Sequence, residues 1–179
     1  RNHFERLMAS VIIFSQFRRQ IWSFGDCQCL INDDLYKGEK KIDELLAEVR
    51  SFYLQAELAA GKSVADLMVK DTGREMILPF LKMQSQFANK EGEYRFPVLD
   101  GFEINLDDIH KIDVEQGDEI VLASDGYPFL MKSLRQSEVS LKMLHEKDPL
   151  CMSIFKSTKG FKIDQESFDD RAYIRFIAD

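Results

Sequence analysis

Apolar positions at the beginning of the chain follow the pattern of β-strands. Residues 7–17 are apolar and rich in β-branched side chains, and after Arg18 and Arg19 the apolar character resumes at residues 21–24 and 27–31. Short apolar runs separated by polar or glycine-containing segments are typical of strands joined by turns. This pattern predicts a β-hairpin and its continuation.

The next segment has the spacing of an amphipathic helix. Apolar side chains spaced three and four residues apart lie on one helical face. Here that stripe ends near Gly61 and consists of Ile42, Leu45, Leu46, Val49, Phe52, Tyr53 and Ala56. We expect a helix that packs this stripe against a sheet.

Further helices are predicted downstream. Ser63 precedes Asp66 by three residues, which is a capping pattern for a helix N-terminus. Residues 71–73 are expected to end that helix, and residues 74–89 resume helical spacing. Together they form a predicted helical insertion over about 40–90. Its methionines and phenylalanines are ordinary core residues, which favours packing over partner binding or a lid.

The rest of the chain mixes both patterns. Residues 109–114 and 119–124 are predicted to pair as antiparallel strands, and the alternating segment 172–177 predicts a final strand. Three helices are expected between these strands, one starting at Pro128, one at Ser137 and a short one from Asp148 to Phe155.

Composition narrows the class of protein. The 179 residues are 45% hydrophobic and 31% charged, which suits one domain spanning residues 1–179. A net charge of −7 argues against nucleic-acid binding, which needs a basic patch. No apolar run approaches the roughly 20 residues of a membrane span, and the start does not resemble a secretory signal. The three cysteines lack zinc-site spacing and suit a reducing, cytoplasmic compartment.

Candidate chemistry starts at a strand end. The buried run 120–123 leads directly into Ser124-Asp125-Gly126. A carboxylate at the rim of a buried sheet is costly unless charge or hydrogen bonds compensate it, and glycine allows a tight turn or a close approach. A metal site would provide that compensation. Taken alone, the same three residues are also an ordinary turn with a capping aspartate.

Two further acids have similar surroundings. Asp26 follows the apolar segment 21–24, and Asp169 and Asp170 come just before the last predicted strand. Acids at several strand ends can converge on one point, and carboxylates are the oxygen ligands that Mg²⁺ prefers. The pattern therefore indicates a metal site that includes Asp26, Asp125 and Asp169.

Three segments together resemble a known family. VEQGDEIVLASDGYPFL, SFGDCQCLI and SFDDRAYIRFI are similar to three motifs of the PPM, or type 2C, family of metal-dependent protein phosphatases, and they occur in the family's order. The resemblance implies an α+β fold, a four-layer αββα sandwich of antiparallel sheets. It also implies phosphate ester hydrolysis by a metal-activated water, with phosphoserine, phosphothreonine or small phosphoesters as substrates.

The resemblance also assigns roles to residues. Asp125, with Gly126, would bind a core metal, Asp169 would bind it as well, and Asp26 would serve a more loosely held one. The cofactors implied are Mn²⁺ or Mg²⁺ in a two-metal centre. Carboxylates suit this chemistry, because metal ions can orient and deprotonate water without a covalent protein nucleophile.

The chain also departs from the family pattern. Cys27 and Gln28 replace a Ser-Arg pair, Asp170 replaces an Asn, and Phe129 stands where some members have an acid. The family's Asp-Gly-His-Gly motif, whose acid bridges two metals, is missing, and Asp100-Gly101 lies in the wrong place for it. The centre is therefore expected to be incomplete in this chain.

Two explanations follow from these departures. Because the chain starts at Arg1 without a methionine, the fold is expected to be incomplete at its N-terminus. A missing N-terminal segment or a second chain would then complete the sheet beside residues 7–17 and cover its edge. The alternative is a degenerate phosphatase-fold domain that binds a protein partner without catalysis.

Convergence of the three acids separates these two functions, because an interaction domain would use them only as dispersed turn caps. A hydrolase with Ser124 or a cysteine as nucleophile is disfavoured, because no histidine lies in a motif that would activate either.

Overall fold

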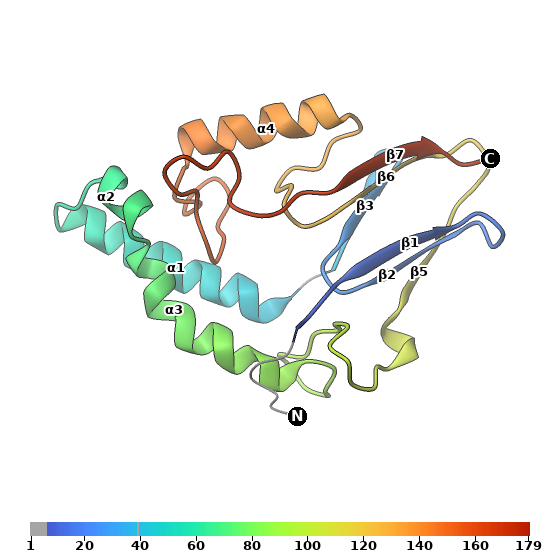
Figure 1. Ribbon diagram of the computed structural model, residues 1–179, viewed down its shortest axis with the longest axis horizontal. Coiled ribbons are helices and arrows are strands. Elements are labelled where there is room, and N and C mark those ends of the chain that lie inside the picture. The colour runs from blue at the N-terminus through green and yellow to red at the C-terminus, as the bar shows by residue number, and fades with distance from the viewer. Residues whose placement is uncertain (1–6, 39) are drawn as a thin grey trace.

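Two antiparallel sheets organise the protein (Figure 1). A computed structural model describes residues 7–38 and 40–179. The three-stranded sheet has the order β1 (Val11–Ser15), β2 (Gln20–Phe24), β5 (His110–Asp113). The four-stranded sheet has the order β4 (Asp34–Lys37), β3 (Gln28–Ile31), β6 (Glu119–Ala123), β7 (Tyr173–Ile177). With the helices beside them, these sheets confirm the α+β class.

The main core lies between the two sheets. Ile21 of β2 packs with Cys29 of β3 and Ile120 of β6, and Phe14 of β1 contacts Phe176 of β7 with ring centroids 4.9 Å apart. Alternate residues of a strand point to one face, so these contacts place the inner faces of the two sheets against each other. The complete four-layer order, with helices on both outer faces, stays a prediction.

The positions of these strands were predicted better than their pairing. The β1–β2 hairpin is confirmed. The predicted pairing of residues 109–114 with 119–124 is wrong, because β5 pairs with β2, whereas β6 pairs with β3 and β7. The connection turns at Gly117, whose φ of +92° favours glycine, and carries the chain from one sheet to the other.

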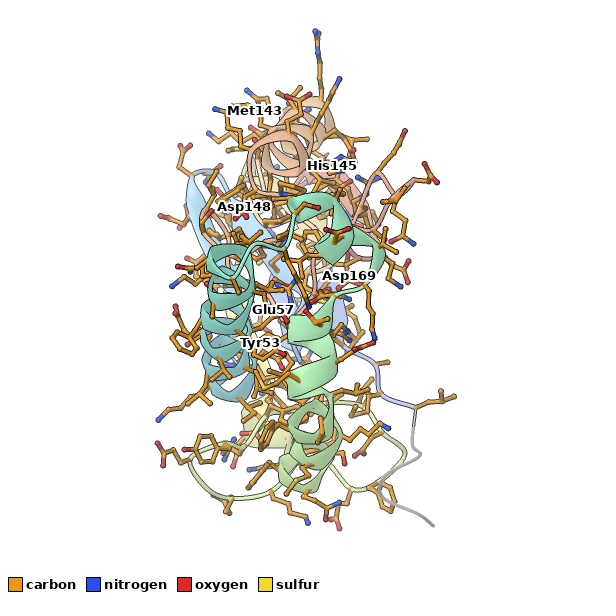
Figure 2. The ribbon with its side chains drawn as sticks, turned by 90° about the vertical axis from the view of Figure 1, so that its left-hand side faces the viewer. Tyr53, Glu57, Met143, His145, Asp148 and Asp169 are labelled. Atoms are coloured by element: carbon orange, nitrogen blue, oxygen red, sulfur yellow. The ribbon has the colours of Figure 1, made fainter. Side chains whose placement is uncertain are left out.

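Two long helices form a hairpin that reaches away from the sheets (Figure 1). They are α1 (Lys41–Ala59) and α3 (Thr72–Met83), with the short α2 (Val64–Val69) between them. Figure 2 shows Tyr53 and Glu57 of α1 facing α3, where Glu57 accepts a hydrogen bond from the Thr72 hydroxyl. No described helix is long and apolar enough to cross a membrane.

The caps of these helices match the sequence only in part. The capping box of Ser63 and Asp66 is present at the start of α2. Residues 71–73 do not end α2, which stops at Val69; they begin α3, because the Asp71 side chain accepts a hydrogen bond from the Arg74 N–H at 2.8 Å. Gly73 then allows close packing, since a Cβ there would lie 2.8 Å from the Leu54 side chain.

The expected buried stripe of α1 is partly wrong. Leu46 is buried, but Leu45, Val49 and Phe52 are exposed, and Phe52 is 75% exposed. The residues buried on this helix are Leu46, Ala47, Arg50, Ser51 and Leu54. The buried face is therefore partly polar, and it is organised around the side chain of Arg50.

Only one of the three helices expected after residue 125 forms as a helix. It is α4 (Leu134–Lys147), which starts after the cap Ser133 rather than at Ser137. The segments starting at Pro128 and at Asp148 are turns and bends. At the second, the Asp148 carboxylate accepts hydrogen bonds from the backbone N–H groups of Met152, Ser153 and Ile154, and this folds the segment into a compact loop. Two 3₁₀ helices, η1 (Gln84–Phe87) and η2 (Leu106–Asp108), complete the described elements.

Candidate functional site

Sheet topology brings the three predicted acids to one edge. Asp26 lies in the connection between β2 and β3, and Gln28 at the start of β3 pairs with Ala123 at the end of β6. Ala123 in turn pairs with Tyr173 at the start of β7. In antiparallel strands the end of one lies beside the start of the next. The segments before β3, after β6 and before β7 therefore meet.

Tight backbone packing holds Asp26 in place. The Asp26 carboxylate accepts a hydrogen bond from the Ser10 hydroxyl. The backbone N–H of Asp26 donates a second hydrogen bond, of 3.2 Å, to the hydroxyl oxygen of Ser10. Gly25 has a φ of +99°, and a side chain there would overlap Ser10. A side chain at Gly38 would overlap the carbonyl oxygen of Gly25. Glycine is therefore required at both positions for this turn to form.

The loop that carries Asp125 is held from two sides. The buried Gln28 side chain donates hydrogen bonds of 2.8 Å to the carbonyl oxygens of Ser124 and Tyr127. Across the loop, a Cβ at Gly126 would overlap the carbonyl oxygen of Asp170. Gly126 therefore packs closely against the segment preceding β7, whereas a close approach to a ligand stays a prediction.

Asp169 is held by hydrogen bonds and one ion pair. Its Oδ1 accepts the N–H of Asp170 at 3.0 Å, and the Ser167 hydroxyl donates to its carbonyl oxygen at 2.7 Å. Its Oδ2 lies 2.5 Å from Lys159 Nζ. Asp169 is labelled in Figure 2 beside the first turns of α3, from which Arg74 reaches the same cavity.

All three acids line one cavity of about 590 Å³. The pKa of Asp125 is raised from 3.8 to about 6, first by burial and then by the negative charges of Asp26 and Asp169, while Lys159 opposes the shift. Like charges disfavour ionisation when they lie close together. The three acids therefore share a cavity and influence one another's charge, while their convergence on a metal ion stays a prediction.

The three acids do not form a complete coordination shell for a metal ion. Within residues 7–38 and 40–179, no group of three or more histidine, cysteine or acidic side chains is gathered closely enough to hold a metal ion. Two of the carboxylates are already engaged, Asp26 by Ser10 and Asp169 by Lys159. The donor types nevertheless fit Mn²⁺ or Mg²⁺, since all three offer carboxylate oxygens. A bound cation would also relieve the repulsion at Asp125.

The lining of the same cavity also includes basic side chains. Its cationic side chains are Lys37, Lys40, Arg74, Lys82, Lys156 and Lys159. Several already have partners: Lys40 pairs with Asp43 at 3.0 Å, and Lys156 pairs with Glu48 at 2.6 Å. Acids suited to a cation and basic groups suited to an anion such as a phosphate group thus line the same cavity.

Sequence reasoning missed several residues that shape this cavity. Lys159 and Arg74 lie in segments without a recognisable motif, and Gln28 stood out only as a departure from the family pattern. Gln28 gave one signal, which is a polar side chain at the start of an otherwise apolar strand. Nothing in the local sequence distinguishes Lys159 from the neighbouring lysines.

The structure does not favour a nucleophilic serine or cysteine. The Ser124 hydroxyl donates to the carbonyl oxygen of Asp170 and accepts the N–H of Ala172, so it links two loops. Burial, followed by the charges of Asp26 and Asp125, raises the pKa of Cys27 to about 11. A thiol with this pKa stays protonated at neutral pH.

The two described histidines lie outside this cavity. His145 stacks on Phe161 with ring centroids 4.5 Å apart, and His110 is an exposed residue of β5. His3 lies outside the described residues.

Three comparisons with known proteins gave no match: no family model, no curated protein and no solved structure matches the chain. The resemblance to the PPM family therefore rests on the three sequence motifs.

Proposed function

We propose that this chain is a metal-dependent phosphatase-like domain that hydrolyses phosphate esters in the cavity lined by Asp26, Asp125 and Asp169. The observation that supports this function best is the shared cavity of the three acids, with a pKa of about 6 at Asp125. Dispersed turn caps would not repel one another in this way.

The carboxylates would hold Mn²⁺ or Mg²⁺, with Gly126 keeping the loop of Asp125 close to the segment before β7. When bound, such an ion lowers the pKa of a coordinated water and supplies the nucleophile. Gln28 orients the loop through two carbonyl oxygens, and the lysines that line the cavity attract the phosphate group. Phosphoserine, phosphothreonine and small phosphoesters are the proposed substrates, and the cytoplasm is the proposed location.

A protein-binding domain without catalysis is the second candidate. The observation that favours it is the exposed apolar stripe of Leu45, Val49 and Phe52 on α1, together with the absence of a ready coordination shell among the described residues. Exposed apolar patches often mark interaction sites.

The phosphatase proposal is tested by hydrolysis of p-nitrophenyl phosphate with and without Mn²⁺, using the 179-residue chain. We expect Mn²⁺-dependent turnover that Asp125→Ala abolishes, because a ligand of the metal is lost. Asp107→Ala is the matched control, since this exposed aspartate lies outside the described cavities. Absence of metal-dependent turnover, or full activity of Asp125→Ala, would reject the proposal.

A further inference from the structure

Lys159 lies on a loop whose backbone carbonyl groups accept hydrogen bonds from two arginines. Arg50 of α1 donates to the carbonyl oxygen of Ser157 at 2.9 Å, and Arg74 of α3 donates to that of Thr158 at 2.8 Å. Arg50 is fully buried and forms an ion pair of 2.7 Å with Asp71. The backbone before Lys159 is therefore fixed to the helical hairpin.

The Lys159 side chain serves as the counter-ion of the acids. Its Nζ lies 2.5 Å from Oδ2 of Asp169, and its charge also stabilises the carboxylate of Asp125. The side chain is 32% exposed, so its ammonium group borders the solvent of the cavity. Lysine carries a compact charge on a flexible four-carbon stem, so it can change partners while its backbone stays in place.

This position conflicts with a metal ion. A divalent cation bound to Asp169 would lie at short range from the Lys159 ammonium group on the same carboxylate. Coulomb repulsion between the two cations would drive the ammonium group away. Lys156, an earlier lysine of the same loop, has no such conflict, because it pairs with Glu48 at 2.6 Å.

We propose that Lys159 exchanges partners: it neutralises Asp169 when no divalent cation is bound, and it binds the phosphoryl oxygens of the substrate once a cation has taken that carboxylate. This inference rests on the proposed function. Lysine is a common phosphate ligand that acts as a point charge, and the freed ammonium group would remain inside the cavity that receives the substrate. Lys159 thereby links metal binding to substrate binding.

The test compares Lys159→Gln with Lys162→Gln, since both variants remove one positive charge from the same loop, and the exposed Lys162 lies outside the cavity. Calorimetry measures the affinity for Mn²⁺ and then the affinity of the Mn²⁺-saturated protein for orthophosphate. For Lys159→Gln we expect Mn²⁺ to bind about fivefold more tightly and orthophosphate about fivefold more weakly. For Lys162→Gln both affinities should change less than about twofold.

The opposite signs exclude a merely structural role, because damage to the loop would weaken both affinities. Equal shifts in the two variants, or weaker binding of both ligands to Lys159→Gln, would overturn the partner exchange. Binding of Mn²⁺ by neither the parent chain nor Lys159→Gln would overturn it together with the metal site. If both affinities shift as expected but p-nitrophenyl phosphate is not hydrolysed, the partner exchange is upheld and the phosphatase function is rejected. If p-nitrophenyl phosphate is hydrolysed but the affinities do not shift, the phosphatase function is upheld and the partner exchange is rejected.

Discussion

Asp125 is the residue on which the electrostatics of the cavity converge. Burial and two neighbouring carboxylates raise its pKa to about 6, and one ammonium group opposes them. A carboxylate in this state binds a proton in weakly acidic solution, and under the proposed function it would bind a metal ion in neutral solution. Perturbed acids of this kind gather at functional sites, where charge is brought together at a cost in stability.

The raised pKa of Asp125 predicts a pH-dependent cost in stability. As the pH rises from about 4 to about 6, the unfolded chain loses this proton before the folded chain does. The free energy of unfolding contributed by this group therefore falls across that window. Asp125→Asn should be more stable than the parent at about pH 7, by on the order of 1 kcal/mol after allowance for solvent screening, and should show little gain near pH 4.

Urea unfolding of both proteins at the two pH values measures this difference. A gain that is equal at both values, or a loss at neutral pH, would contradict the charge repulsion assigned to Asp125.

Gly126 is predicted to tolerate no side chain. In Gly126→Ala the methyl group would overlap the carbonyl oxygen of Asp170, which is backbone and cannot rotate away. We expect a loss of about 1–3 kcal/mol in the free energy of unfolding and weaker Mn²⁺ binding. Denaturant titration and calorimetry measure the two effects.

Gly117→Ala is the control for this substitution. It lies before the same strand, with open space around it but a φ of +92°, and it should cost stability without changing Mn²⁺ affinity. Unchanged stability and metal affinity in Gly126→Ala would show that the two loops are not packed as described.

Helix α1 shows how far periodicity predicts an element. Apolar spacing predicted the helix and its end, because these depend on neighbouring residues. It failed for the buried face, because Arg50 and Ser51 are polar and only distant partners explain their burial. Arg50 meets Asp71 and the carbonyl oxygen of Ser157, and Ser51 donates to the carbonyl oxygen of Met152 at 2.6 Å.

Arg50→Ala is therefore predicted to be severely destabilising. It leaves Asp71 without its buried partner and frees two backbone carbonyl groups, and breaking such a pair costs about 3–5 kcal/mol. Denaturant unfolding measures the loss. Lys62→Ala, which removes an exposed ion pair with Glu57, should change stability little. Similar effects of both substitutions would argue against Arg50 as the link between the hairpin and the loop.

Strand pairing marks a second limit of the sequence. The alternation in residues 109–114 and 119–124 correctly predicted two strands. It could not show that they belong to different sheets, because a short turn normally joins neighbours in one sheet. The choice is made by contacts far along the chain, such as those of β6 with β3 and β7.

Across the whole molecule, the pairing of strands explains why the sequence could indicate that the acids lie together. It could not indicate the basic residues of the same cavity. Asp26, Asp125 and Asp169 lie next to strands, and antiparallel pairing brings those strand ends together. Lys159 and Arg74 reach the cavity only because a helical hairpin and a loop pack against each other through Arg50. Such packing leaves no periodic trace in the sequence.

The proposed function depends on binding of a divalent cation by these three acids. Crystals of the 179-residue chain grown with Mn²⁺, measured at the manganese absorption edge, test it most directly. We predict an anomalous difference peak about 2.0–2.3 Å from a carboxylate oxygen of Asp125, with Asp169 turned towards the ion and released from Lys159. A map without a manganese peak at Asp125, with Lys159 still paired to Asp169, would contradict the account.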